Sequence, residues 1–508
     1  MLVSFPQSRI RFCNDKPILN NRKYVLYWMQ ANRRLASNHS LDYAVQLAKE
    51  LGKELVIYEG LRKDYPWNSK RLHQFILEGM IDNAKEAERI SANYWSYVET
   101  PKNPAQGLLK KIAENAVSII TDDFPCFIIP EQIENLSKKV DCQVIAIDGN
   151  GIIPLSEYGN FASAARILRP RIHKLFSNHY LLKAKQSYKK AELANLNQGS
   201  FAPFPKFGAT SNDISQVLKE ISFSNNVEPV LGTKGGRNQA LKFLKVFIHN
   251  KITNYETLRS KPDHPSQVAV SHLSAYLHFG HISAEEIITA VLDWSEEIYT
   301  KGKSTNWTPE RINIDFKGKR EKFYSPVSSA NSYLDELITW RDTGYQMFWH
   351  KREFRKNIEI LPDWIKANFA RHKKDKRDYK YNKDEWLNSK THDPIWNAAQ
   401  TELVHTGRMH NYMRMLWGKK IIEWSPSLEE AFDLLEEFNN LYAYDGRNPN
   451  SYTGILWCFG LFDRPWFPER NVLGNVRYMS SDSTRKKFKL AGYLDYVDSL
   501  TNSQGSLF

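Results

Sequence analysis

Short apolar runs alternate with amphipathic segments over the first third of the chain. The run YVLYWM at residues 24–29 is followed by SLDYAVQLAKELG at 40–52, whose apolar residues recur at helical spacing before a glycine stop. Four further runs repeat the theme, with helical patterns between them: ELVIY (54–58), ANYWSYVE (92–99), VSIITDD (117–123) and QVIAIDG (143–149). Strands that alternate with helices predict an α/β domain with a doubly wound parallel sheet over residues 22–155.

Three aspartates stand at the ends of predicted strands, namely Asp122, Asp123 and Asp148. Sheets of this kind bind ligands beyond the carboxyl ends of their strands. No GxGxxG motif accompanies these residues, so the interpretation as helix caps and turn residues is favoured for each.

The pattern changes after residue 155. Residues 156–235 predict an interdomain connector, which contains the Gly-, Pro-, Ser- and Asn-rich stretch NLNQGSFAPFPKFGATSND (195–213). From 236 to 500 helical periodicity dominates, which predicts an all-α C-terminal domain.

The 508-residue chain carries a net charge of +13, which favours a polyanionic partner over mere solubility. Basic clusters recur in the helical half and fit contacts to a phosphate backbone: KGKREK (317–322), HKREFRK (350–356), RHKKDKR (371–377) and RKKFK (485–489). The four cysteines are scattered singly, without metal spacing, and are interpreted as reduced thiols. With no signal peptide or apolar span predicted, we expect a cytoplasmic protein, at the nucleoid in a bacterium or in the nucleus of a eukaryote.

The stretch THDPIWNAAQTELVHTGRMHNYMRMLWGKKIIEW (391–424) mixes aromatic, methionine and polar residues. Interpreted as a helix from about His405, it carries an apolar stripe that includes Trp417 and Trp424, with Met415 on the opposite face. A methionine in that position is either a gap-filler or the adaptable wall of a ligand pocket.

Three other stretches combine polar and aromatic groups. In SYLDELITW (332–340), Glu336 and Trp340 are four residues apart and share a helix face. An acid beside an indole could bind a flat heterocycle, or the two could be an ordinary surface glutamate beside a core tryptophan. Ser271 and Ser274 could serve a phosphate or simply cap a helix. Residues 438–470 combine turn formers with aromatic residues, as binding mouths often do.

These stretches together resemble the photolyase/cryptochrome flavoproteins and, within them, the class II cyclobutane pyrimidine dimer photolyases. The resemblance covers nearly the whole chain and is carried by the 391–424 stretch, LSAYLHFGHIS (273–283), YDGRNPN (444–450) and GNVRYMS (474–480). The more divergent first third still contains IDGNGIIP (147–154) and LRPRIHKLF (168–176).

The resemblance implies an N-terminal antenna domain and a helical domain that holds FAD. It implies a light-driven lyase in which excited reduced FAD passes an electron to a dimer flipped out of double-stranded DNA. Deazaflavin and folate are both antenna chromophores of the family, and we expect a monomer. Two alternatives stay open: a cryptochrome photoreceptor with the same FAD site and little repair, and a basic DNA-binding protein without flavin.

The resemblance also assigns roles residue by residue. Electron transfer to the flavin falls to Trp396, Trp417 and Trp424. Contacts with the lesion fall to Glu336, Trp340, Met415, Trp457, Trp466 and Arg477, the last of which enters the space that the flipped dimer leaves. The FAD site is matched by Tyr255, Ser271, Leu273, Ser274, Arg341, Asn439 and Asp445, with Asn439 near flavin N5. No metal site is implied.

Three departures from the class II pattern affect these assignments. Leu416 stands where that class usually has a tyrosine beside an electron-transfer tryptophan. The segment WCFGLFDRPWFPER (457–470) is one residue short before Asp463 and one long after Trp466, which affects the role of Trp466. The continuation GYQMFWHKREF (344–354) also differs.

Overall fold

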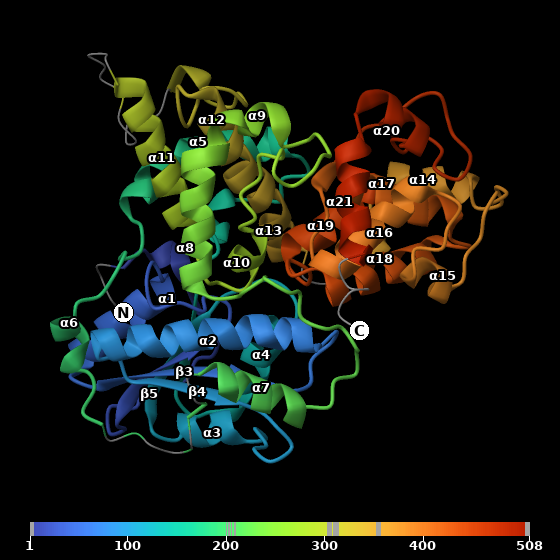
Figure 1. Ribbon diagram of the computed structural model, residues 1–508. Coiled ribbons are helices and arrows are strands. Elements are labelled where there is room, and N and C mark those ends of the chain that lie inside the picture. The colour runs from blue at the N-terminus through green and yellow to red at the C-terminus, as the bar shows by residue number, and fades with distance from the viewer. Residues whose placement is uncertain are drawn as a thin grey trace.

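The computed structural model describes residues 5–199, 201, 204, 206–207, 210–301, 307, 314–351 and 357–502. Parts of the predicted connector, residues 352–356 of the basic segment HKREFRK and the tail from 503 lie outside the described residues. A sheet domain forms the lower part of the molecule in Figure 1, and helices form the two upper groups.

The sheet contains the strands β1 (Ile10–Phe12), β2 (Tyr24–Met29), β3 (Glu54–Leu61), β4 (Tyr94–Val98), β5 (Ala116–Asp122) and β6 (Gln143–Ile147). Their order is β1-β6-β5-β2-β3-β4, and every pair is parallel except β1 with β6. The predicted α/β fold with a parallel sheet is therefore confirmed.

Alternate residues of β2 face opposite sides of the sheet. Val25 and Tyr27 pack into a core with helices α1 (His39–Leu51) and α2 (Lys70–Ile90), whereas Leu26 and Trp28 pack with α3 (Leu108–Ala113) and α4 (Ile129–Lys139). All six residues of β2 are buried. Burial of both faces explains why this strand is a continuous apolar run.

The sequence pattern did not predict β1. This strand is only three residues long, half exposed and polar at its centre, and it pairs antiparallel with the edge of the sheet. The sheet therefore begins before residue 22, where the domain was expected to start.

The strand-end aspartates have structural roles. Asp122 accepts hydrogen bonds from the backbone N–H groups of Gln30, Ala31 and Asn32, and Asp123 pairs with Arg11. Asp148 accepts hydrogen bonds from the backbone N–H groups of residues 150 and 155. Turns after β2 and β6 therefore satisfy Asp122 and Asp148, whereas the central arginine of β1 satisfies Asp123.

The rest of the described chain is helical. The helices are α5 (Ala165–Leu181), α6 (Lys190–Ala194), α7 (Ser211–Glu220), α8 (Arg237–Val246), α9 (Tyr255–Leu258), α10 (Ser274–His278), α11 (Ala284–Thr300), α12 (Ser328–Leu334), α13 (Arg341–His350), α14 (Asp363–Arg371), α15 (Lys383–Leu387), α16 (Pro394–Thr406), α17 (Asn411–Trp424), α18 (Leu428–Tyr442), α19 (Pro449–Cys458), α20 (Ser481–Lys487) and α21 (Ala491–Asn502). Helices α5 to α7 lie within the predicted connector. No described helix is both long enough and apolar enough to cross a bilayer.

The helix predicted from His405 to Trp424 is wrong, because the segment forms two helices. Helix α16 ends at Gly407, whose φ of +67° is left-handed, and α17 begins at Asn411. A side chain at Gly407 would lie 2.5 Å from the Tyr444 ring. Close packing and the left-handed turn both require glycine here.

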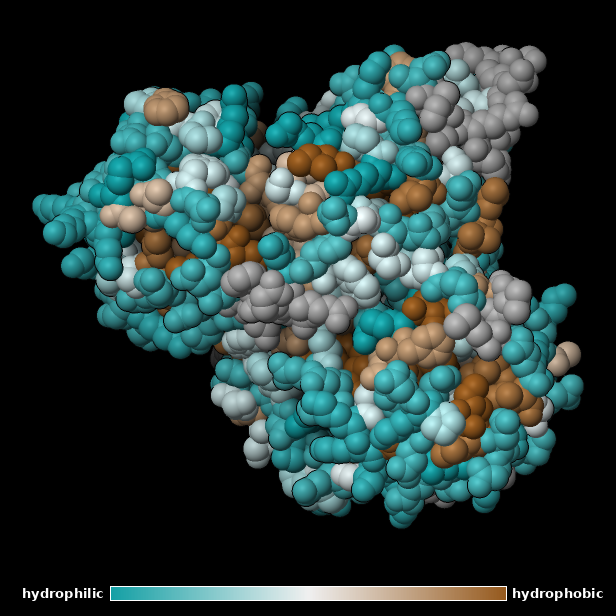
Figure 2. Space-filling model, turned by 180° about the vertical axis from the view of Figure 1, so that it is seen from behind, coloured by the Kyte–Doolittle hydropathy of each residue, from teal (hydrophilic) through white to brown (hydrophobic). Residues whose placement is uncertain are grey.

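The sheet domain and the helices share one core. Leu61, Phe75 and Phe124 of the sheet domain belong to the same buried cluster as residues as distant as Val497. The back face of the molecule is mostly hydrophilic, with hydrophobic side chains gathered in patches (Figure 2).

Candidate functional site

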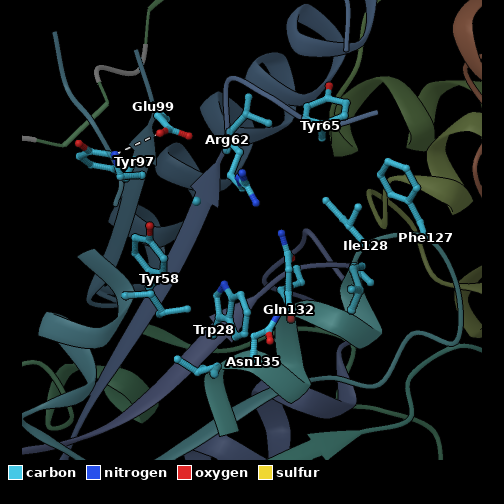
Figure 3. A pocket seen from close by; sticks show the side chains of 18 of the residues that line it. Trp28, Tyr58, Arg62, Tyr65, Tyr97, Glu99, Phe127, Ile128, Gln132 and Asn135 are labelled. Carbon is cyan, nitrogen blue, oxygen red and sulfur yellow. Dashed lines mark hydrogen bonds between the residues drawn. The ribbon is translucent and has the colours of Figure 1, made fainter. Parts of the chain in front are cut away.

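A cavity of about 640 Å³ lies at the carboxyl edge of the sheet. Trp28 at the end of β2, Tyr58 of β3 and Tyr97 of β4 line one side, and the segment 127–136, which includes the first two turns of α4, lines the other (Figure 3). Phe279 and Arg447 of the helical domain complete the lining. The strand order reverses between β2 and β5, so the cavity occupies the usual ligand position of a doubly wound sheet.

Two arginines at this cavity, Arg33 and Arg447, have internal partners. Arg33 lies 3.0 Å from Glu59, whose carboxylate is fully buried and also accepts a hydrogen bond from Tyr94. Burial lowers the pKa of Arg447 to about 10. The aromatic walls and few fixed polar groups suit a flat, conjugated ligand.

A second cluster lies among the helices, where four predicted residues come together. Tyr255 at the start of α9 packs against Tyr333, with ring centroids 5.0 Å apart. A hydrogen bond joins Tyr333 to Ser271, and burial raises the pKa of Tyr333 to about 12. Ser271 Oγ accepts a hydrogen bond from the N–H of Leu273, which leads directly into α10 and its first residue, Ser274.

Asp445 joins this cluster from the loop after α18. Arg414 of α17 donates a hydrogen bond to it over 3.2 Å, and Ser274 supplies another. Burial would raise the pKa of Asp445, but these two partners outweigh it and the pKa is lowered. Asn439, also buried, donates to Asn440 over 3.3 Å and to Ser451.

Several buried polar atoms near this cluster have no hydrogen-bond partner among the described residues. They include Nη2 of Arg408 and Nε1 of Trp340. Buried polar groups are nearly always satisfied, so these nitrogens are available to hydrogen-bond a polar ligand. A dinucleotide with phosphates and a heterocycle fits such a donor set.

Arg341 has a different environment. Its guanidinium lies 4.0 Å from the centroid of the Tyr345 ring and 3.2 Å from Asp342, on the side of Gly151. These contacts face the junction with the sheet domain.

Glu336 and Trp340 lie on a π-helical segment, Asp335–Trp340, between α12 and α13. Such segments are frequent at functional sites. The Trp340 ring lies 5.4 Å from that of Trp457 on α19, so the fold brings together two predicted residues more than a hundred positions apart. Met415, on α17, is half-buried against the core.

Trp466 and Arg477 lie at the surface, on the segment between α19 and α20. The guanidinium carbon of Arg477 is 5.3 Å from the Trp466 ring centroid, and that of Arg464 is 5.2 Å away. Two cations therefore flank one exposed indole, an arrangement typical of nucleic-acid surfaces.

The three predicted electron-transfer tryptophans are all buried. Trp417 Nε1 donates to Gln400 over 2.8 Å, and Trp396 Nε1 donates to the Trp417 carbonyl over 3.1 Å. The Trp396 and Trp424 rings have centroids 6.4 Å apart. The indoles thus form a connected series through the interior.

Sequence reasoning missed several residues of these clusters. Trp386 was overlooked, although its ring lies 4.9 Å from Trp396 and 6.0 Å from Trp424. Arg414 was noticed only as a polar member of the 391–424 stretch. Arg259 pairs with Glu336. Its position after a short helix carries no sequence signal, and only the fold brings it there.

Comparisons with known proteins agree with this architecture. No family model matches the chain. The deoxyribodipyrimidine photo-lyase of Methanothermobacter thermautotrophicus is 30% identical over 494 residues, which cover 97% of this chain and 98% of that protein.

Two solved structures share the fold. A bacterial class III photolyase from Agrobacterium tumefaciens has a TM-score of 0.60 at 17% identity and covers 94% of this chain and 86% of its own. A Synechocystis cryptochrome has a TM-score of 0.60 at 15% identity and covers 93% and 88%. With near full-length similarity to a relative at 30% identity, the chain belongs to the photolyase/cryptochrome family, in which it aligns with the deoxyribodipyrimidine photo-lyases.

Proposed function

We propose that this protein is a class II photolyase that repairs cyclobutane pyrimidine dimers in double-stranded DNA, acting as a monomer wherever the cell keeps its DNA. The observation that carries the proposal is the packing of Trp340 against Trp457 with Glu336 one turn away. Two indoles provide an apolar wall for the pyrimidine dimer, and the acid provides a hydrogen bond to its edge.

In this proposal each lesion residue has one task. In its protonated form, Glu336 donates a hydrogen bond to a carbonyl of the dimer and stabilises the negative charge that develops there. Trp340, Trp457 and the adaptable Met415 enclose the pyrimidine rings. Arg477 fills the gap left in the duplex, and Trp466 makes a further contact with the lesion.

The second cluster is proposed to hold FAD. When bound and reduced, FAD supplies the light-excited electron for the dimer. Tyr255, Ser271, Leu273 and Ser274 serve its phosphates and sugar chain, joined by the orphan nitrogen of Arg408. Asn439 and Asp445 serve the ring system, and Arg341 approaches it from the junction with the sheet domain. Trp417, Trp396 and Trp424 carry electrons between this site and the surface.

The cavity at the sheet edge is proposed to hold the antenna chromophore. Its volume of about 640 Å³ fits a conjugated ring system. The walls formed by Trp28, Tyr58 and Tyr97 can stack on such a ring. Fluorescence of chromophore released from the purified protein distinguishes a deazaflavin from a folate.

The test is repair by the purified protein after chemical reduction. Illumination with an oligonucleotide that contains one thymine dimer should restore two thymines, and the dark sample should restore none. A flavin-containing protein that leaves the dimer intact in the light would instead be a cryptochrome-like photoreceptor. A colourless protein would overturn the flavin site altogether.

A further inference from the structure

Beyond the three assigned tryptophans lies a tyrosine–histidine pair at the outer end of the indole series. Tyr381, just before α15, packs edge-on against Trp424 with ring centroids 5.7 Å apart and against Trp386 with centroids 5.1 Å apart. Its hydroxyl is hydrogen-bonded to Nδ1 of His392. Tyr381 is half-buried, whereas His392 is exposed.

The hydrogen-bond pattern indicates that the Tyr381 hydroxyl donates its proton to Nδ1 of His392. The backbone N–H of His392 donates to the Tyr381 oxygen over 3.1 Å. That oxygen already accepts one hydrogen, so its own hydrogen is free to point at Nδ1. Partial burial lowers the pKa of His392, against the attraction of Asp393, so the imidazole is neutral at pH 7 and can accept a proton.

A path for the proton leads away from the imidazole. His392 lines a polar cavity of about 390 Å³, together with Trp424, Lys420 and Glu423. A proton that reaches Nδ1 can therefore be balanced by loss of the Nε2 proton to solvent.

We propose that Tyr381 and His392 form a proton-coupled terminal electron donor for this indole series. When Trp424 or Trp386 has been oxidised to its radical cation, Tyr381 gives it one electron and restores the neutral indole. The phenolic O–H bond breaks as the Nδ1–H bond forms, which leaves a neutral tyrosyl radical and an imidazolium. A thiol in solution then returns a hydrogen atom to the tyrosine.

Proton transfer to His392 stabilises the oxidised state of Tyr381, which a tyrosine without a neighbouring base would not achieve. An oxidised phenol is a very strong acid, so loss of its proton to a nearby base makes electron return to the radical unfavourable. The hole is thereby held on Tyr381, at the outer end of the indole series. The inference rests on the proposed function only for the origin of the oxidised tryptophan.

Tyr379 offers a matched control. It stacks on the same imidazole at 3.5 Å and lies 6.2 Å from the Trp424 ring, and it is 45% exposed. The structure gives its hydroxyl no hydrogen bond to His392. Ring contact alone would favour either tyrosine, whereas the hydrogen bond selects Tyr381.

The test is transient absorption and electron paramagnetic resonance of the purified full-length protein after a blue flash. Wild type and Tyr379→Phe should both form a neutral tyrosyl radical, and Tyr381→Phe should keep only tryptophan radicals. His392→Gln preserves a hydrogen-bond acceptor but no useful base, so tyrosine oxidation should slow by about a hundredfold and lose its solvent deuterium effect. An unchanged tyrosyl signal in Tyr381→Phe, or an unchanged rate in His392→Gln, overturns the proposal.

A second arm separates this inference from the proposed function. A ruthenium photo-oxidant with persulfate oxidises surface-near indoles without using the flavin. If a Tyr381-dependent radical forms with the ruthenium oxidant but not after a blue flash, the tyrosine–histidine pair is supported and the proposed light-driven electron transfer from the flavin site is not. If tryptophan radicals form in either experiment but no Tyr381-dependent radical follows them, the proposed role of the pair is wrong and the proposed function is unaffected.

Discussion

Arg259 places a guanidinium nitrogen 2.7 Å from Oε1 of Glu336, and Arg320 lies 3.5 Å from the same oxygen. Burial raises the pKa of Glu336, and the two arginines oppose that rise. The sequence left open that Glu336 is an ordinary surface acid on a helix face, but these ion pairs show that its carboxylate has fixed partners. It is held in a defined orientation beside the paired indoles Trp340 and Trp457.

We expect Glu336→Ala to lower the quantum yield of repair, because it removes the group that stabilises charge on the dimer. By analogy with a lost oxyanion-hole donor, the barrier should rise by about 2–4 kcal/mol. Glu336→Gln, which still offers a hydrogen bond, should recover part of the yield. Repair by chemically reduced protein is the measurement. Glu359→Ala, at an exposed acid, serves as the control, and equal yields in all four proteins would remove Glu336 from the lesion site.

Trp417→Phe should stop photoreduction but not repair by chemically reduced protein, because phenylalanine is much harder to oxidise than tryptophan. It also leaves Oε1 of Gln400 without its donor, so stability should fall by about 1–3 kcal/mol. Leu416, which replaces the usual tyrosine, offers no alternative relay at this step.

The control for this variant is Trp95→Phe in the sheet domain. Trp95 is likewise buried and donates its indole hydrogen to Asn93 over 2.7 Å. It should lose similar stability and keep full photoreduction. Flash photoreduction with an external thiol, together with thermal unfolding, separates the two effects, and wild-type photoreduction in Trp417→Phe would disprove the assigned path.

DNA binding should weaken steeply with salt. If about five phosphates are neutralised, log K should fall against log salt with a slope near −4 to −5. Arg477→Ala should lower affinity for damaged DNA without changing that slope, since Arg477 is proposed to fill the gap in the duplex. Lys486→Ala, in the basic cluster of α20, should reduce the slope by about one if that lysine contacts a phosphate. Titrations at several salt concentrations test both, and a slope near zero would exclude DNA as the partner.

Glu402 predicts a pH dependence of stability. Burial raises its pKa to about 7, although Tyr493 and the N–H of His410 donate hydrogen bonds to it. Because the folded-state pKa lies above the unfolded value, the contribution of Glu402 is complete below about pH 4.5 and is lost as the pH rises through 7. Glu402→Gln should therefore be more stable than wild type at pH 8, by on the order of 3 kcal/mol. Chemical denaturation at pH 5 and pH 8 measures this, and a pH-independent difference would contradict it.

The amino-acid sequence was sufficient for the architecture. Five of the six strands and the first helix follow from local periodicity, since strands buried on both faces must be continuous apolar runs. The exception, β1, is too short and polar to leave a pattern. The resemblance carried by the motifs at 273–283 and 444–450 also named Ser274 and Asp445, which a hydrogen bond joins in the structure.

Tertiary structure alone decided which distant side chains meet. The pairing of Glu336 with Arg259, of Trp340 with Trp457 and of Tyr381 with His392 across α15 each joins separate elements, and no local pattern encodes such contacts. The break at Gly407 was also missed: Gly407 adopts a left-handed φ of +67°, and the approach of the Tyr444 ring excludes a side chain there. Periodicity reports which face of an element is buried, whereas packing between elements determines what that face touches.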